Sequence, residues 1–139
     1  MSSVNLNILT LNVRGISSVM KREKVYMWCE NQNADIILLQ ETHCTKRKVN
    51  NFASSWKGES FHAVSDSPYS KGVSILFREN LNVKINNVHE YLHGRALLLN
   101  IEIHRQGFTV ISMYAPNEEK QRAEFFRNLQ RWINEKVIS

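Results

Sequence analysis

The 139-residue sequence lacks the features that mark several specialised classes of protein. No apolar run approaches the roughly 18–20 residues of a membrane-spanning helix, and the opening stretch "MSSVNLNILTLNVRG" lacks the basic and apolar regions of a signal peptide. The two cysteines, Cys29 and Cys44, have no metal-ligand spacing, and there is no internal repeat, low-complexity tract or linker. These absences argue against a membrane protein, a zinc ribbon and a disulfide scaffold. We expect an intracellular chain with reduced thiols.

What is present is the composition of one globular domain. Hydrophobic residues make up 42% and charged residues 22% of the chain, and the length suits a single domain over residues 1–139. The net charge is +5, which favours a polyanionic partner such as nucleic acid. Two local clusters, "KREK" (21–24) and "TKRK" (45–48), could follow phosphates more closely than scattered charge.

The first third of the chain has the pattern of strand, helix and strand. "VNLNILTLN" (4–12) alternates polar and apolar residues like a strand. Helical spacing follows over 19–31. "ADIILLQ" (34–40) is an apolar run too short for a typical helix and suits a strand that is buried on both faces. This order predicts a right-handed βαβ unit with two parallel strands.

The middle of the chain changes to short strands separated by turn-prone pieces. The connections "REN", "HGR" and "RQG" are short, which favours antiparallel pairing. The predicted strands are 59–65, 72–78, 81–89, 96–104 and 108–114.

Both predicted helices have candidate caps. Ser17 or Ser18 can cap the first, and Asn117 can cap a long helix that follows "YAP". The first helix shows Val25, Trp28 and Cys29 at helical spacing. The last helix repeats apolar residues every three to four positions, at Phe125, Phe126, Leu129, Trp132, Ile133 and Val137.

Three predicted strands end in polar side chains. Asn12 closes the first strand, Glu41 follows the second, and Tyr114 closes the last. Sites in α/β sheets form outside the carboxyl ends of strands, so Asn12 and Glu41 should be neighbours. A carboxylate with waters can hold Mg²⁺, and an amide and a phenol can donate hydrogen bonds to phosphate oxygens. The pattern favours a hard cation and a phosphate.

Five pieces of the sequence, in this order, resemble the endonuclease/exonuclease/phosphatase superfamily. They are "LTLNVRGI", "ADIILLQETH", "SKGVSILF", "GRALLLNIEI" and "ISMYAPNEE", which together run along nearly the whole chain. Within this superfamily the chain is most similar to the apurinic-like endonuclease domain of LINE-type (non-LTR) retrotransposons. The resemblance implies an α/β fold, the four-layer α/β/β/α sandwich of DNase I-like proteins. We expect mainly its first sheet with flanking helices.

The resemblance also implies roles for individual residues. Glu41 matches a metal-ligand Glu, and Asn12 matches an Asn that helps to hold the metal and the catalytic groups. Tyr114 matches a Tyr that hydrogen-bonds the scissile phosphate, which makes Asn12, Glu41 and Tyr114 the candidate catalytic residues. Asn117 matches an Asn that touches the DNA backbone. Arg14 replaces an Asp of apurinic repair enzymes and would face phosphate instead.

The implied reaction is hydrolysis of a DNA phosphodiester with Mg²⁺ or, as the alternative, Mn²⁺. In a longer parent protein the resemblance implies a reverse transcriptase domain on the same chain, and a nuclear location for action on chromosomal DNA. For Arg95, Lys71 and His43 it assigns no role. We expect solvated charges at Arg95 and Lys71 and a satisfied surface histidine at His43.

Two motifs of this superfamily are absent from the chain. One is an Asp-x-Asn motif that positions the attacking water, and the other is a C-terminal Ser-Asp-His motif. The sequence has two aspartates only, Asp35 at the start of a predicted strand and Asp66 in a turn. We therefore expect a C-terminally truncated domain that is marginally stable and inactive alone. Apolar residues of "VISMY" and "ALLLNIEI" should be exposed if no second sheet covers them.

Three functions remain open at this point. The chain could be a fragment of a DNA-nicking endonuclease. It could be a catalytically dead remnant that binds DNA through basic residues alone. It could also be a phosphatase of the same family that acts on a non-DNA phosphoester, such as a phosphoinositide or a nucleotide tail. For DNA binding, the candidate cations are Lys21, Arg22, Lys46, Arg47 and Lys48.

Overall fold

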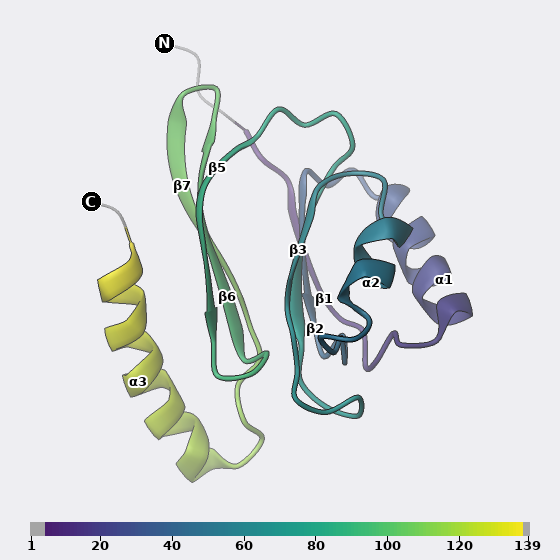
Figure 1. Ribbon diagram of the computed structural model, residues 1–139. Coiled ribbons are helices and arrows are strands. Elements are labelled where there is room, and N and C mark those ends of the chain that lie inside the picture. Colours follow the sequence, from purple (N-terminus) through teal and green to yellow (C-terminus); the bar gives the residue numbers. More distant parts are fainter. Residues whose placement is uncertain (1–4, 138–139) are drawn as a thin grey trace.

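The computed structural model describes residues 5–137 and consists of seven strands and three helices (Figure 1). Residue 4 of the first predicted strand lies outside the described residues, as do 1–3, 138 and 139. In chain order the elements are β1 (Ile8–Asn12), α1 (Val19–Glu30), β2 (Ile36–Gln40), α2 (Val49–Ser55), β3 (Ser60–Ala63), β4 (Val73–Phe77), β5 (Lys84–Tyr91), β6 (Ala96–Ile103), β7 (Gln106–Met113) and α3 (Glu119–Lys136).

The first sheet has four strands in the order β1-β2-β4-β3. β1 and β2 are parallel, with Ile8 opposite Ile36 and Asn12 opposite Gln40, and α1 connects them. The predicted βαβ unit is therefore confirmed. β4 runs antiparallel to both β2 and β3. The parallel pairing brings the carboxyl ends of β1 and β2 to the same edge of the sheet.

The second sheet is antiparallel, in the order β5-β6-β7, and it packs face to face on the first sheet. The shared core contains Ile75 and Phe77 from β4 with Leu97, Leu99 and Ile101 from β6, all of them buried. The sequence predicted mainly the first sheet, with the apolar residues of "ALLLNIEI" exposed if no second sheet covered them, but a second sheet is present and these residues are buried. The chain itself supplies strands to both sheets, so each sheet covers the inner face of the other.

Helices cover both outer faces, which completes four layers. α1 and α2 lie on the outer side of the first sheet, and α3 lies on the far side of the second sheet (Figure 1). The core between the first sheet and its helices includes Tyr26, Cys29 and Phe52. Phe125 and Leu129 of α3 pack against Ala96. The predicted α/β/β/α sandwich is confirmed, whereas α2 was not predicted from the sequence.

The helix ends and faces differ from the prediction in two places. Ser18 caps α1, its hydroxyl accepting from the Lys21 backbone N–H at 3.5 Å, as expected. Trp28 is 45% exposed, and Tyr26 occupies the buried position instead. Asn117 does not cap α3, because the cap position belongs to Glu118, whose side chain makes no capping hydrogen bond.

Both cysteines are free and buried, as the sequence predicted. Burial raises the pKa of Cys29 to about 11 and the pKa of Cys44 to about 12, so both remain protonated, unreactive thiols at neutral pH. No helix within residues 5–137 is both long enough and apolar enough to cross a membrane.

Leu99→Ala tests the packing between the two sheets. Leu99 is fully buried in the shared core, so truncation should lower the free energy of unfolding by about 2–5 kcal/mol. Val88, the partner of Leu99 across β5 and β6, is 42% exposed, and Val88→Ala should cost less than about 1 kcal/mol. Urea denaturation followed by circular dichroism measures both, and equal losses would contradict the packing.

Candidate functional site

The carboxyl end of β1 is shaped by a tight turn that places Asn12. The Asn12 Oδ1 accepts the backbone N–H of Arg14 at 3.0 Å, a local side-chain turn typical of Asn. Arg14 and Gly15 both adopt left-handed backbone conformations, with φ of 51° and 85°. Because its oxygen is engaged in this turn, Asn12 directs its Nδ2 away from Arg14 and toward β2.

The Glu41 carboxylate accepts a hydrogen bond from that amide. Asn12 Nδ2 donates to Glu41 Oε2 at 2.5 Å. Glu41 is half-buried and also has a left-handed backbone, with φ of 55°, a conformation that costs a non-glycine residue of the order of 1–2 kcal/mol. The Gly15 N–H donates to the Glu41 carbonyl at 2.6 Å. The two predicted neighbours therefore meet directly, and the turn after β2 holds the carboxylate at the sheet edge.

Tyr114 reaches the same edge from the second sheet. Ser112 of β7 donates its hydroxyl to the Leu39 carbonyl at 3.2 Å, and Gln40 Nε2 donates to Ser112 Oγ at 3.4 Å. These bonds tie the end of β7 to the end of β2. The Tyr114 N–H donates to the Arg95 carbonyl at 2.8 Å. The three predicted strand ends thus belong to one rim of the sandwich.

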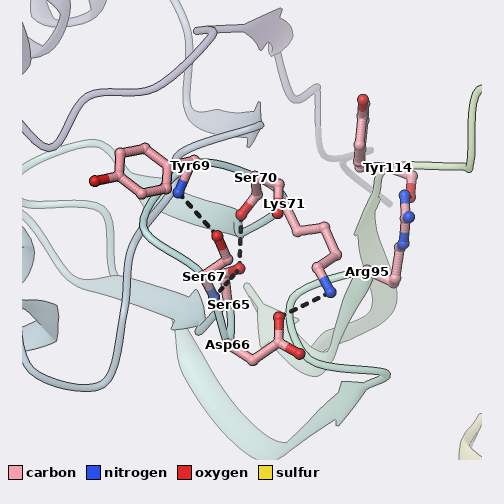
Figure 2. Close-up of polar contacts among 8 residues, drawn as sticks. All are labelled: Ser65, Asp66, Ser67, Tyr69, Ser70, Lys71, Arg95 and Tyr114. Atoms are coloured by element: carbon pink, nitrogen blue, oxygen red, sulfur yellow. Dashed lines mark hydrogen bonds and ion pairs between the residues drawn. The ribbon is translucent and has the colours of Figure 1, made fainter.

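Arg95 packs against Tyr114 instead of extending into solvent. Its Cζ lies 5.2 Å from the centre of the Tyr114 ring, and its Nη1 donates to the Tyr114 carbonyl at 3.2 Å. Figure 2 shows the two side chains next to each other. The prediction of a solvated charge at Arg95 is wrong, because a guanidinium stacks on an aromatic ring while keeping its hydrogen-bond donors. In the sequence, Arg95 ends the predicted turn "HGR" directly before β6, and this position at a strand start was the available clue that it lies at the edge of a sheet.

Lys71 was also wrongly predicted to be solvated. Its Nζ lies 2.8 Å from Asp66 Oδ1, and 21% of its side chain is exposed. Its carbonyl accepts the His43 backbone N–H at 2.8 Å, which joins the segment before β4 to the turn after Glu41. Sequence reasoning missed this ion pair because Asp66 lies in a turn with no periodic pattern.

His43 is half-buried beside this rim, and its Nε2 has no hydrogen-bond partner among residues 5–137. The prediction of a satisfied surface histidine is therefore wrong. The ring lies against Gly15, where an added Cβ would be 2.5 Å from His43 Nδ1. Burial lowers the pKa of His43, Glu41 raises it, and Lys21 lowers it. Neutral imidazole is the form that this packing favours.

The basic clusters divide into exposed and buried members. Lys46 and Arg47 are exposed, and Lys21 Nζ donates to the Arg14 carbonyl at 3.1 Å. Arg22 is 2% exposed and is therefore removed from the candidate DNA contacts. Its Nη1 donates to the carbonyls of Ile16 and Ser17 at 3.2 and 3.1 Å. The buried guanidinium holds the loop after β1 in place.

The two remaining predicted residues are exposed. Arg14 lies in the turn after Asn12. Asn117 lies three positions after Tyr114, and its carbonyl accepts Arg122 Nη1 at 2.5 Å. Both side chains are available to a ligand at the surface, whereas no contact joins Asn117 to Glu41 within the described part of the chain.

A divalent metal fits this site only as a sparsely liganded ion. No three His, Cys, Asp or Glu side chains gather as a metal-binding group among the residues described. Mg²⁺ keeps several waters and is often held by one or two carboxylates together with substrate phosphate. Glu41 offers one half-buried carboxylate whose Oε2 is fixed by Asn12. The Asn12 amide oxygen, which was predicted as a second ligand, is instead turned toward the Arg14 N–H. The donor set therefore suits Mg²⁺ or Mn²⁺ with water and phosphate as further ligands.

Comparison with known proteins gives a family and a fold. The family model described as Endonuclease/Exonuclease/phosphatase matches residues 9–138. An uncharacterized 149 kDa protein of transposon TX1 from Xenopus laevis is 27% identical over 130 residues, covering 92% of this chain and 10% of that protein. An AP endonuclease from Archaeoglobus fulgidus superposes with a TM-score of 0.70 at 21% identity, covering 96% of this chain and 53% of that one.

A third match is a 3′ phosphatase from Neisseria bound to a product DNA hairpin, with a TM-score of 0.68 at 18% identity. It covers 95% of this chain and 52% of that one. The chain thus spans about half the length of the two structures and a tenth of the transposon protein. At these identities the structures establish a shared fold.

The pKa of His43 should respond to both charged neighbours. In metal-free buffer we expect a pKa below 6.5 because of burial. Glu41→Gln should lower it further, since a nearby carboxylate stabilises imidazolium, and Lys21→Met should raise it. Titration of the ring resonances by NMR measures all three. Identical values in the three proteins would contradict the arrangement of these groups.

Proposed function

Because this chain belongs to the endonuclease/exonuclease/phosphatase family, we propose that its site serves Mg²⁺-dependent hydrolysis of DNA phosphodiesters in the endonuclease of a LINE-type retrotransposon. The observation that carries this proposal is the hydrogen bond from Asn12 to Glu41 at the rim where Tyr114 also lies. It orients a carboxylate at the carboxyl ends of the parallel strands, where sites in α/β sheets form.

Each residue has a distinct task in this proposal. Glu41 would hold the ion, and the hydrogen bond from Asn12 sets the orientation of the carboxylate. When bound there, Mg²⁺ would supply the charge that stabilises the phosphate and the leaving oxygen. Tyr114 donates its hydroxyl to an oxygen of the scissile phosphate. Arg14 and Asn117, both exposed, contact the DNA backbone on either side.

The choice of DNA as substrate is supported by charge and by the relatives. The net charge of +5 and the exposed Lys46 and Arg47 favour a polyanion over a small phosphoester. The relative from Xenopus is a transposon protein, and the Neisseria structure contains a DNA hairpin. In a longer parent chain we propose a reverse transcriptase domain and action in the nucleus.

The catalytic set within these 139 residues is incomplete. Neither Asp-x-Asn nor Ser-Asp-His occurs in the sequence. Hydrolysis of a phosphodiester needs an activated nucleophile as well as charge stabilisation. We therefore propose that the 139-residue chain binds DNA and the ion but does not cut by itself. The same absence favours the second candidate function, a DNA-binding remnant without catalysis.

A metal-binding measurement tests whether Glu41 is a metal ligand, and it does not require the chain to be catalytically active. We expect Glu41→Ala to weaken Mn²⁺ binding at least about tenfold, since among residues 5–137 no group of three acidic, His or Cys side chains could replace this carboxylate. Glu102→Ala, on the far side of the second sheet in the pair with Lys84, should leave it unchanged. Electron paramagnetic resonance of free Mn²⁺ gives both affinities. Equal affinities for the two variants would remove Glu41 from the site.

Plasmid nicking tests the proposed incompleteness. With supercoiled plasmid and Mg²⁺, the chain should produce no more open-circle DNA than Glu41→Ala does. Both proteins should retain binding that weakens as salt rises. Nicking by the parent chain that disappears in Glu41→Ala would show that these residues suffice for hydrolysis. Nicking that is unchanged in the variant would point to a contaminating nuclease.

A further inference from the structure

In the ion pair between Lys71 and Asp66, the lysine is the more buried partner and the aspartate is the more exposed one. The two atoms, Lys71 Nζ and Asp66 Oδ1, are 2.8 Å apart (Figure 2). The lysine side chain is 21% exposed and the aspartate side chain is 55% exposed. The cation therefore belongs to the rim of the site, whereas the carboxylate approaches it from the solvent side. That is the direction from which a ligand would also come.

The loop that carries Asp66 is held by its own serines. Ser65 Oγ donates to the Ser70 carbonyl at 2.6 Å and accepts from the Ser67 N–H at 3.0 Å. The Tyr69 N–H donates to Ser67 Oγ at 3.1 Å. These bonds, drawn in Figure 2, fix the loop between β3 and β4. The carboxylate is therefore presented to Lys71 by an ordered scaffold.

The backbone just before Arg95 meets the backbone just after Lys71 at two glycines. The Gly72 N–H donates to the Gly94 carbonyl at 3.0 Å, and a Cβ on Gly94 would lie 2.7 Å from the Gly72 nitrogen. Arg95 has no carboxylate within 4.0 Å in the part of the chain described here. A guanidinium has five N–H donors, and the Tyr114 carbonyl takes one of them. Among the described residues the other guanidinium donors have no side-chain or carboxylate partner, so they are available to an external anion.

We propose that Lys71 and Arg95 form a subsite for a backbone phosphate of DNA next to Tyr114, and that Asp66 occupies Lys71 until that phosphate displaces it. The proposal rests on DNA being the substrate. A carboxylate oxygen and a phosphate oxygen are equivalent acceptors for an ammonium group, so Asp66 is an internal substitute for the ligand. Its hydrogen bond from Lys71 keeps the pKa of Asp66 below its usual range, and the carboxylate stays charged at neutral pH.

Binding of a 30-base-pair duplex in EDTA, followed by fluorescence anisotropy over a salt series, tests the subsite. Asp66→Asn should tighten binding about twofold to fivefold, the range for one exposed ion pair. Lys71→Met should weaken binding and reduce the slope of log affinity against log salt by about 0.9. Arg95→Gln, which keeps an amide donor for Tyr114, should reduce the slope by the same amount.

The double variant Asp66→Asn/Lys71→Met distinguishes displacement of Asp66 from Lys71 from the general effect of removing one negative charge. If Asp66 acts by occupying Lys71, Asp66→Asn should give no tightening in the Lys71→Met background. Glu102→Gln is the matched control, since it also breaks an exposed lysine pair but lies at the other end of the sheets. Equal tightening by Asp66→Asn and Glu102→Gln, or tightening that persists in the double variant, would overturn the proposal. Circular dichroism checks that each variant is folded.

The outcomes also separate this proposal from the proposed function. Duplex binding by the parent chain, with no specific effect of Asp66→Asn, would reject the displacement and leave DNA as the substrate. No duplex binding by the parent chain at low salt would reject both. A single-stranded oligonucleotide of equal length provides a second probe, and the same ordering of variants is expected because the contact is to the backbone.

Discussion

A row of backbone hydrogen bonds across the rim of the sandwich is the constraint on which the site depends. It runs from Gly15 to the Glu41 carbonyl, from Thr42 to Gly72, from Gly72 to Gly94 and from Tyr114 to Arg95. The residues that it joins come from five separate segments of the chain. Ordering such loops costs about 1–2 kcal/mol of backbone conformational entropy per residue, and these hydrogen bonds help to offset that cost. The row therefore converts flexible connections into a fixed rim.

The turns joined by these hydrogen bonds contain backbone conformations that most residues avoid. Glu41, His43 and Lys71 all have positive φ, and such strain is tolerated where the surroundings determine the backbone. At Gly72 there is no alternative residue, because its φ is 87° and a Cβ would meet Thr42 Oγ1 at 2.5 Å. The strain lies at the turns that aim Glu41 and Lys71, which is where a binding site benefits from rigidity.

The features that the sequence predicted correctly are those set by the order and periodicity of neighbouring residues. The strand–helix–strand order placed Asn12 beside Glu41 because parallel strands end at one edge. Other features depend on contacts between distant residues. Burial of Arg22 depends on carbonyls and a ring that α1 does not contain. The helix α2 has no side-chain cap hydrogen bond, so tertiary packing of Phe52 must stabilise it.

Arg22 links that unpredicted helix to the rim. Its Nε donates to Ser55 at the end of α2, its guanidinium stacks 4.6 Å from the Phe52 ring centre, and its Nη1 holds the carbonyls of Ile16 and Ser17. Opening α2 would leave a permanent charge without part of its surroundings, at considerable energetic cost. Because Arg22 joins the loop after β1 to α2, we expect the two to open as one cooperative unit, with amide protons that exchange with solvent together.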